Sequence, residues 1–241
     1  MVKQIIFVIG VLIFANCAAF SLQKRVGVSV SHNYIRGVER GLTSYAVEGE
    51  IQGEKLGAML GFQSNDLLCD VSAFGKWWVF TQELDYCTLR YGLDAVYHYE
   101  HFRYDGETIT RENDFLADIC FSLTMENDFS FNICSGYGAK LSFLPALEKP
   151  ISDFTPCVYI GVSKRFASAY ELSFSSATHT FYRYPLFCSP DYTLTFSYTS
   201  SNGVCGSLSG DVRINDQFTT APYINRIALT ASLLFHIQST L

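Results

Sequence analysis

The sequence predicts an all-β chain that closes on itself as an antiparallel transmembrane β-barrel of about twelve strands. Hydrophobic residues make up 49% of the chain and charged residues only 17%, whereas soluble domains carry roughly 25% charged residues. Beyond residue 20, no apolar run approaches the ~20 residues that a membrane helix needs. Apolar and polar residues instead alternate from residue 25 almost to the C-terminus. A closed barrel is the structure that lets such strands satisfy their backbone groups in lipid.

The alternation is clearest in the middle of the chain and near its end. One predicted strand face carries Phe115, Ala117, Ile119, Phe121, Leu123 and Met125. After the tight turn at Glu126–Asp128, the next strand carries Phe129, Phe131, Ile133, Tyr137, Leu141 and Phe143. Later, Tyr192, Leu194, Phe196 and Tyr198 alternate with Thr193, Thr195 and Ser197. A period of two over about ten residues is what a tilted membrane strand requires.

This periodicity predicts twelve strands. We place them at 25–35, 43–52, 54–63, 66–80, 86–102, 113–126, 128–144, 155–165, 168–177, 190–199, 204–214 and 224–238. The segment 66–80 is taken as one strand, although Gly75 could mark a turn or a bulge. Splitting or merging strands there would change the count toward ten or fourteen.

The predicted connections sort by length. The gaps that follow odd-numbered strands are 36–42, 64–65, 103–112, 145–154, 178–189 and 215–223, and five of these six are long and polar or contain proline. The gaps that follow even-numbered strands, near 53, 81–85, 127, 166–167 and 200–203, are all short. Long loops at one end of a barrel and short turns at the other are typical of outer-membrane proteins.

Residues 1–21 read as a signal peptide, which leaves residues 22–241 as a single barrel domain. Lys3 supplies the positive charge, 5–14 form the apolar segment, and small residues precede cleavage after Ala19 or Ser21. An uncleaved anchor and a lipoprotein signal ending at Cys17 are the two alternatives.

The alternation and the sorting of loops, over nearly all of residues 25–241, resemble small to medium bacterial outer-membrane β-barrels. The resemblance is generic and rests on no family-specific motif. It implies location in the bacterial outer membrane, with outer-membrane lipid and the barrel assembly machinery as partners. The net charge of −6 and the lack of a basic patch give no support to nucleic-acid binding.

The polar positions of each strand should face the lumen. The charged candidates there are Asp70, Lys76, Arg90, Asp94, His98, Glu100, Asp118, Lys140, Glu171, Asp211 and Arg213. They support two interpretations: a packed, salt-bridged interior, or a narrow porin-like or uptake channel whose charges select solutes. Twelve strands lie between the eight that enclose only side chains and the sixteen that enclose an aqueous channel.

Other functions remain open. A structural or surface-interaction barrel with a plugged lumen would act through the loops at 103–112 and 178–189. The second loop is rich in aromatic residues that could contact a surface ligand, namely His179, Phe181, Tyr182, Tyr184 and Phe187. A secreted β-sandwich is the non-membrane alternative, but regular apolar stripes on its water-facing side argue against it.

No enzyme, metal or cofactor is predicted. A membrane-embedded hydrolase would need a histidine such as His98, His101 or His179 beside Ser173 or Ser175, but neither their spacing nor a nucleophile-elbow motif supports it. The cysteines show no CxxC or other zinc-ligand spacing.

One cysteine pair can be placed from the turn alone. Seven cysteines follow the signal segment. If the turn is centred on Asn127, Cys120 and Cys134 lie directly opposite each other on the lumen face. Opposed Cβ atoms in antiparallel strands can approach to about 4.5 Å, near disulfide geometry. We therefore predict that this pair is close enough for a disulfide.

Overall fold

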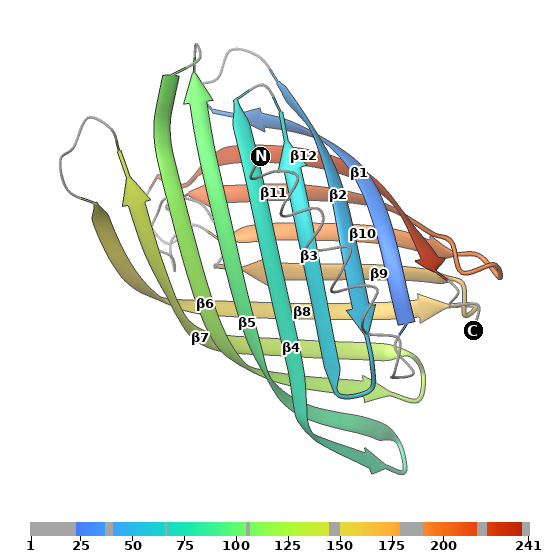
Figure 1. Ribbon diagram of the computed structural model, residues 1–241. Helices are drawn as coiled ribbons and strands as arrows, with labels where there is room; N and C mark the ends of the chain where they lie inside the picture. Colours follow the sequence, from blue (N-terminus) through green and yellow to red (C-terminus); the bar gives the residue numbers. More distant parts are fainter. Residues whose placement is uncertain are drawn as a thin grey trace.

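The computed structural model describes residues 23–36, 41–65, 67–104, 107–144, 150–178, 190–215 and 221–237. Within them the chain forms twelve strands and closes as an antiparallel barrel, which confirms the predicted fold class (Figure 1). The strands are β1 (Gln23–Ile35), β2 (Leu42–Gln52), β3 (Leu56–Ser64), β4 (Leu68–Leu84), β5 (Cys87–Tyr104), β6 (Glu107–Met125), β7 (Phe129–Phe143), β8 (Ile151–Phe166), β9 (Tyr170–Ala177), β10 (Asp191–Thr199), β11 (Cys205–Asn215) and β12 (Tyr223–Ile237).

Each strand pairs with its sequence neighbours, and β1 closes the barrel by pairing with β12. This last ladder runs from Lys24 opposite Ile237 to Ile35 opposite Arg226. Closure gives every strand a neighbour on both sides, as the membrane-embedded wall of a barrel requires. We call the end with the short connections after even-numbered strands the turn end, and the opposite end the loop end.

Large apolar side chains cover the outside of the barrel. Examples on β6, β9 and β10 are Phe115, Ile119, Leu172, Phe174, Leu194 and Phe196, all of them exposed. The polar residues between them point inward, because successive side chains of a strand face opposite sides of the sheet. The fold is therefore apolar outside and polar inside, the reverse of a soluble protein, and the hydrophobic residues that are exposed are too many for an aqueous surface.

Among the described residues, no helix is long and apolar enough to cross a membrane.

One predicted feature of the fold differs in the structure. The expected loop at 103–112 is mostly strand, because β5 continues to Tyr104 and β6 begins at Glu107. A register shift between Phe102 and Arg103 accompanies this longer hairpin. The single strand predicted over 66–80 is confirmed. Gly75 pairs with Ala95 inside β4 and marks neither a turn nor a bulge, and the only register shift of the β4–β5 ladder falls between Trp78 and Phe80.

The turn end is built from short connections, as predicted. Asp128 adopts a positive φ of 62° in the β6–β7 turn, and Ala167 and Ser168 do so in the β8–β9 turn. Figure 1 shows that the β4–β5 hairpin extends beyond its neighbours at this end. The described chain also starts and finishes here, since Lys24 and Ile237 are paired.

The predicted signal peptide at 1–21 lies outside the described residues.

Candidate functional site

The inner face of the barrel holds the charged side chains that the sequence singles out. Asp94, His98, Glu100, Asp118 and Arg213 are buried. The half-buried members are Asp70, Lys76, Lys140, Glu171 and Asp211. Arg90 differs, because it is exposed. It lies toward the turn end, on the projecting β4–β5 hairpin, where the barrel wall no longer encloses it.

A thiol–carboxylate cluster lies on neighbouring strands in the turn-end half of the barrel. We define it as Asp94 on β5 with Cys120 on β6 and Cys134 on β7. Their ligating atoms all lie within 4.8 Å of one another. The Cys134 Sγ lies 3.8 Å from Oδ2 of Asp94, and Lys76 on β4 reaches the same oxygen with its Nζ at 3.3 Å.

The register explains why this cluster forms. Cys120 pairs with Cys134 across the β6–β7 ladder and with Gly92 across the β5–β6 ladder. Gly92 has no side chain, so the next inward residue of β5, Asp94, is the one that reaches toward the thiols. The ring of Trp78 lies against Gly92 and also lies 4.8 Å from the Lys76 Nζ. Lys76 is thereby held between an aromatic face and a carboxylate, a favourable position for a cation.

A second cluster lies nearer the loop end on β4 to β7. His98 is 2% exposed. Its Nε2 lies 2.7 Å from Oδ2 of Asp70, and its Nδ1 lies 3.4 Å from Oδ2 of Asp114. Between β6 and β7, the Lys140 Nζ lies 2.6 Å from Oε2 of Glu112. This arrangement links four strands, because each basic side chain is placed against an acidic residue of another strand.

A third group lies at the loop end of β10 to β12. Arg213 donates two hydrogen bonds to Asp191, from Nε to Oδ1 at 2.9 Å and from Nη2 to Oδ2 at 2.5 Å. Arg226 approaches the same carboxylate at 3.4 Å. This bidentate geometry is the strong form of an arginine–carboxylate pair. Asp191 is 2% exposed, so the pair is dry.

The remaining inner-face candidates have simpler surroundings. Asp211 accepts a hydrogen bond of 2.5 Å from the hydroxyl of Thr193. Glu171 lies 3.4 Å from Arg165 near the turn end, and both side chains are substantially exposed to solvent.

Cys120 and Cys134 are directly opposite, in the register that the Asn127 turn predicts. Both are buried free thiols in the structure. The disulfide between them stays a prediction.

The histidines and serines that a hydrolase would need are dispersed. His98 is held by two carboxylates on β4 and β6. His101 contacts the hydroxyl of Thr108 at 3.0 Å. Ser173 and Ser175 lie on β9, with β6, β7 and β8 intervening, and Ser175 is hydrogen-bonded to Tyr159. These contacts give His98 an ion-pairing role.

The aromatic loop candidates His179, Phe181, Tyr182, Tyr184 and Phe187 lie outside the described residues. The other predicted contact loop, 103–112, is replaced by the long β5–β6 hairpin, so it offers no extended loop for a surface ligand.

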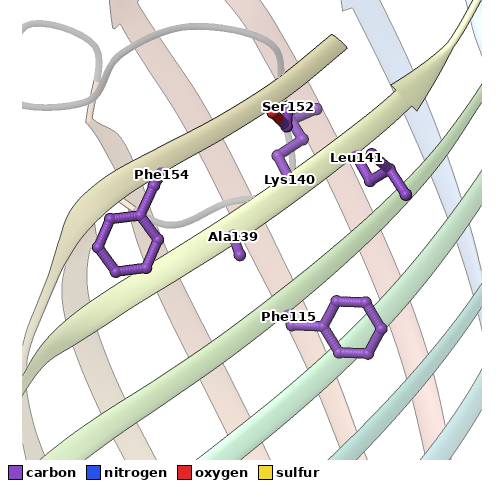
Figure 2. Close-up of a pocket in the computed structure, with 6 residues that line it drawn as sticks. All are labelled: Phe115, Ala139, Lys140, Leu141, Ser152 and Phe154. Carbon is purple, nitrogen blue, oxygen red and sulfur yellow. The ribbon is translucent and has the colours of Figure 1, made fainter. Parts of the chain in front are cut away.

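The outer wall has a shallow notch of about 350 Å³ over β6 to β8. Figure 2 shows that Phe115 and Phe154 stand on either side of Ala139, with Leu141, Lys140 and Ser152 toward the far end. Phe154 also stacks on Tyr137, with ring centroids 5.1 Å apart. The small side chain of Ala139 between larger rings makes the notch.

Several charged groups of the inner face were not singled out from the sequence. Among them are Arg25, Glu112, Asp114, Asp191 and Arg226. Asp114 and Glu112 fell next to or inside a predicted loop, and Asp191 is the first residue of its strand. The parity of Glu112 follows only from the longer β6, whereas the alternation already places Asp114 and Asp191 on the polar face of their strands.

No family model matches the sequence, and no curated protein matches it. Solved structures with similar folds are outer-membrane barrels. The NanC porin matches with a TM-score of 0.59 and 12% identity over 87% of this chain and 100% of that one. The KdgM porin, in a complex with disordered oligogalacturonate, matches with a TM-score of 0.53 and 6% identity over 88% and 99%.

The translocator domain of the autotransporter NalP from Neisseria meningitidis has a TM-score of 0.50 and 12% identity, over 98% of this chain and 95% of that one. At these identities the comparisons establish the fold, which is that of bacterial outer-membrane β-barrels.

Proposed function

We propose that this protein is a narrow channel in the bacterial outer membrane that admits small cationic or neutral solutes in preference to anions. The observation that carries this proposal is the charge of the inner face. Twelve strands enclose a lumen intermediate between a filled barrel and a wide pore, so side chains on the inner wall act on a solute at close range.

Carboxylates outnumber basic groups on the described inner face. The inward acidic residues are Glu48, Glu50, Asp70, Asp94, Glu100, Glu112, Asp114, Asp118, Glu171, Asp191 and Asp211. The inward basic residues that the wall encloses are Arg25, Lys76, His98, Lys140, Arg213 and Arg226, and Arg90 and Arg165 add to them at the exposed turn end. Acidic groups that line a pore favour cations.

The acidic inner wall predicts a different solute from the one found in a similar porin structure. The KdgM structure contains oligogalacturonate, which is a polyanion. An acidic inner wall repels such a ligand, so we expect a different solute class here, whatever the similarity of the fold.

Asp118 is the strongest single candidate for a selectivity residue. Asp118 is 5% exposed, and within the described part of the chain its Oδ1 has no hydrogen-bond partner. It faces Asp94 across the β5–β6 ladder. A mobile cation that passes this point would lower the repulsion between the two carboxylates.

Planar-bilayer recording on the refolded protein tests the proposal. In a KCl gradient we expect stepwise conductance with a reversal potential displaced toward the K⁺ equilibrium potential. In the Asp118→Asn variant the ratio of K⁺ to Cl⁻ permeability should fall by a factor of about two or more, since one lumen charge is removed. Glu83→Gln, an exposed carboxylate at the turn end of β4, is the matched control and should leave the ratio unchanged.

Two outcomes contradict the proposal. Anion preference would show that the inner carboxylates do not set selectivity. A silent bilayer with correctly folded protein would favour the second function, a structural barrel with a blocked lumen. The extensive ion pairing of His98, Lys140 and Arg213 is the observation that favours this second function.

A channel in the outer membrane must be exported and inserted. Residues 1–21 would be removed as a signal peptide, after which the barrel assembly machinery would insert the chain in outer-membrane lipid. Sequencing of the mature N-terminus tests the cleavage. We further propose that the protein is not an enzyme, because the described contacts assign His98 to its two carboxylates.

A further inference from the structure

We infer that Asp94, Cys120 and Cys134 form a binding site for a thiophilic divalent cation of the Zn²⁺ type on the inner wall of the barrel. The three residues come from three adjacent strands, β5, β6 and β7. Their ligand atoms already lie within 4.8 Å of one another without a metal. In a tetrahedral zinc site with metal–sulfur bonds of ~2.3 Å, ligand atoms stand about 3.7 Å apart. The ligand atoms therefore need to move by only about an ångström, which side-chain rotation can supply, to complete a tetrahedral site.

The three residues are shielded from solvent and rigidly placed. Asp94 is 7% exposed, Cys120 1% and Cys134 6%. Each lies inside a long paired strand, so the backbone does not have to move to bring the ligands together. Ligands that rigid strands hold in place before the metal arrives are typical of a functional metal site.

Asp94 has an unused coordinating atom. Its Oδ2 is occupied by Lys76 at 3.3 Å and by the Cys134 thiol at 3.8 Å. Its Oδ1 is buried and has no hydrogen-bond partner among the described residues. A buried carboxylate oxygen without a partner is costly, so the Asp94 carboxylate has an atom free to take part in metal binding beside the two thiols.

The charges balance when the metal binds. Two thiols each lose a proton to water, and a divalent cation takes the place of those two protons. Two thiolates and one carboxylate give −3, the cation gives +2, and the Lys76 ammonium beside Asp94 gives +1, so the group stays neutral. Because thiolates are soft ligands, they select Zn²⁺ or Cd²⁺ over Mg²⁺ or Ca²⁺. Three protein ligands leave a fourth position for water from the lumen.

Cd²⁺ titration of the full folded protein in detergent, kept reduced by a phosphine, tests this site. A sulfur-to-cadmium charge-transfer band should appear and saturate at one equivalent, and Zn²⁺ should displace it, while Mg²⁺ in large excess should not. Cys134→Ser should abolish the tight equivalent. Asp94→Asn should weaken binding at least about 10-fold while it keeps both thiols, and it serves as the second variant if Cys134→Ser fails to fold.

The matched control is Cys157→Ser. Cys157 is also a buried cysteine of the inner face, on β8, and it is outside the cluster. Its loss should leave the titration unchanged. Equal loss in Cys157→Ser and Cys134→Ser, or no saturable binding in the reduced wild-type protein, would overturn the proposal. This measurement needs no ion conduction, so it stands or fails separately from the channel function.

Discussion

At the scale of single residues, the barrel places arginine–carboxylate pairs in very different surroundings. Arg213 and Asp191 are almost fully buried at the loop end and share two hydrogen bonds. Arg165 and Glu171 make a single contact of 3.4 Å near the turn end and remain substantially exposed. Water and salt screen the exposed pair, whereas the buried pair has no solvent to replace a lost partner.

Arg213→Ala should therefore destabilise the barrel by about 3–5 kcal/mol, because it leaves the buried Asp191 without its main partner. Arg165→Ala, the matched exposed variant, should cost less than about 1 kcal/mol. Urea unfolding of both variants in lipid vesicles, followed by tryptophan fluorescence, measures the two free energies of unfolding. Equal losses would mean that water reaches Asp191, so that the loop end of β10 to β12 is not dry.

At the scale of the elements, strand register determines which side chains meet. The β6–β7 ladder runs without a shift through its paired residues, and it places Cys120 against Cys134. Both thiols point to the inner face and lie within 4.8 Å of each other. In the absence of metal, an oxidant that enters the lumen can therefore join them.

We predict that mild oxidation of the metal-free protein links Cys120 to Cys134. Non-reduced tryptic peptides analysed by mass spectrometry should contain this crosslink, and oxidised protein should lose the saturable Cd²⁺ band. The Cys157→Ser variant should form the same crosslink. A dominant link between any other two cysteines would show that the β6–β7 register differs from the one described.

The register of a strand pair could be predicted from the sequence only where a short turn fixes it. The β6–β7 pairing was predictable because Glu126–Asp128 leaves room for only one tight turn. The β5–β6 pairing was not. If 103–112 were a loop, Asp94 would lie opposite Phe121, a residue of the apolar face. In the structure the β5–β6 hairpin is longer and shifts after Phe102, so Asp94 pairs with Asp118 instead. The thiol–carboxylate cluster depends on that second ladder, so the cysteines were identified from the sequence but their carboxylate neighbour was not.

At the scale of the whole molecule, the decisive feature is that the barrel reverses the usual order of polar and apolar surfaces. Long strands alternate between a lipid-compatible outside and a charged inside, and the last strand returns to pair with the first. The alternation in the sequence was enough to predict this, because the side-chain period of a strand is two whatever its partners are. The acidic balance of the interior was less evident, since Glu112 was placed in a predicted loop and joins the inner face only because β6 begins at Glu107.

Accessibility of single sites along β6 in lipid vesicles tests the central claim most directly. In a background with the native cysteines replaced by serine, spin labels would be introduced one at a time at residues 115 to 120. We predict that labels at 115, 117 and 119 collide with lipid-soluble oxygen, whereas those at 116, 118 and 120 collide with a water-soluble nickel reagent or are shielded from both. This alternation with a period of two is the signature of a membrane-spanning barrel wall. Equal exposure of both sets to the water-soluble reagent would contradict a transmembrane barrel.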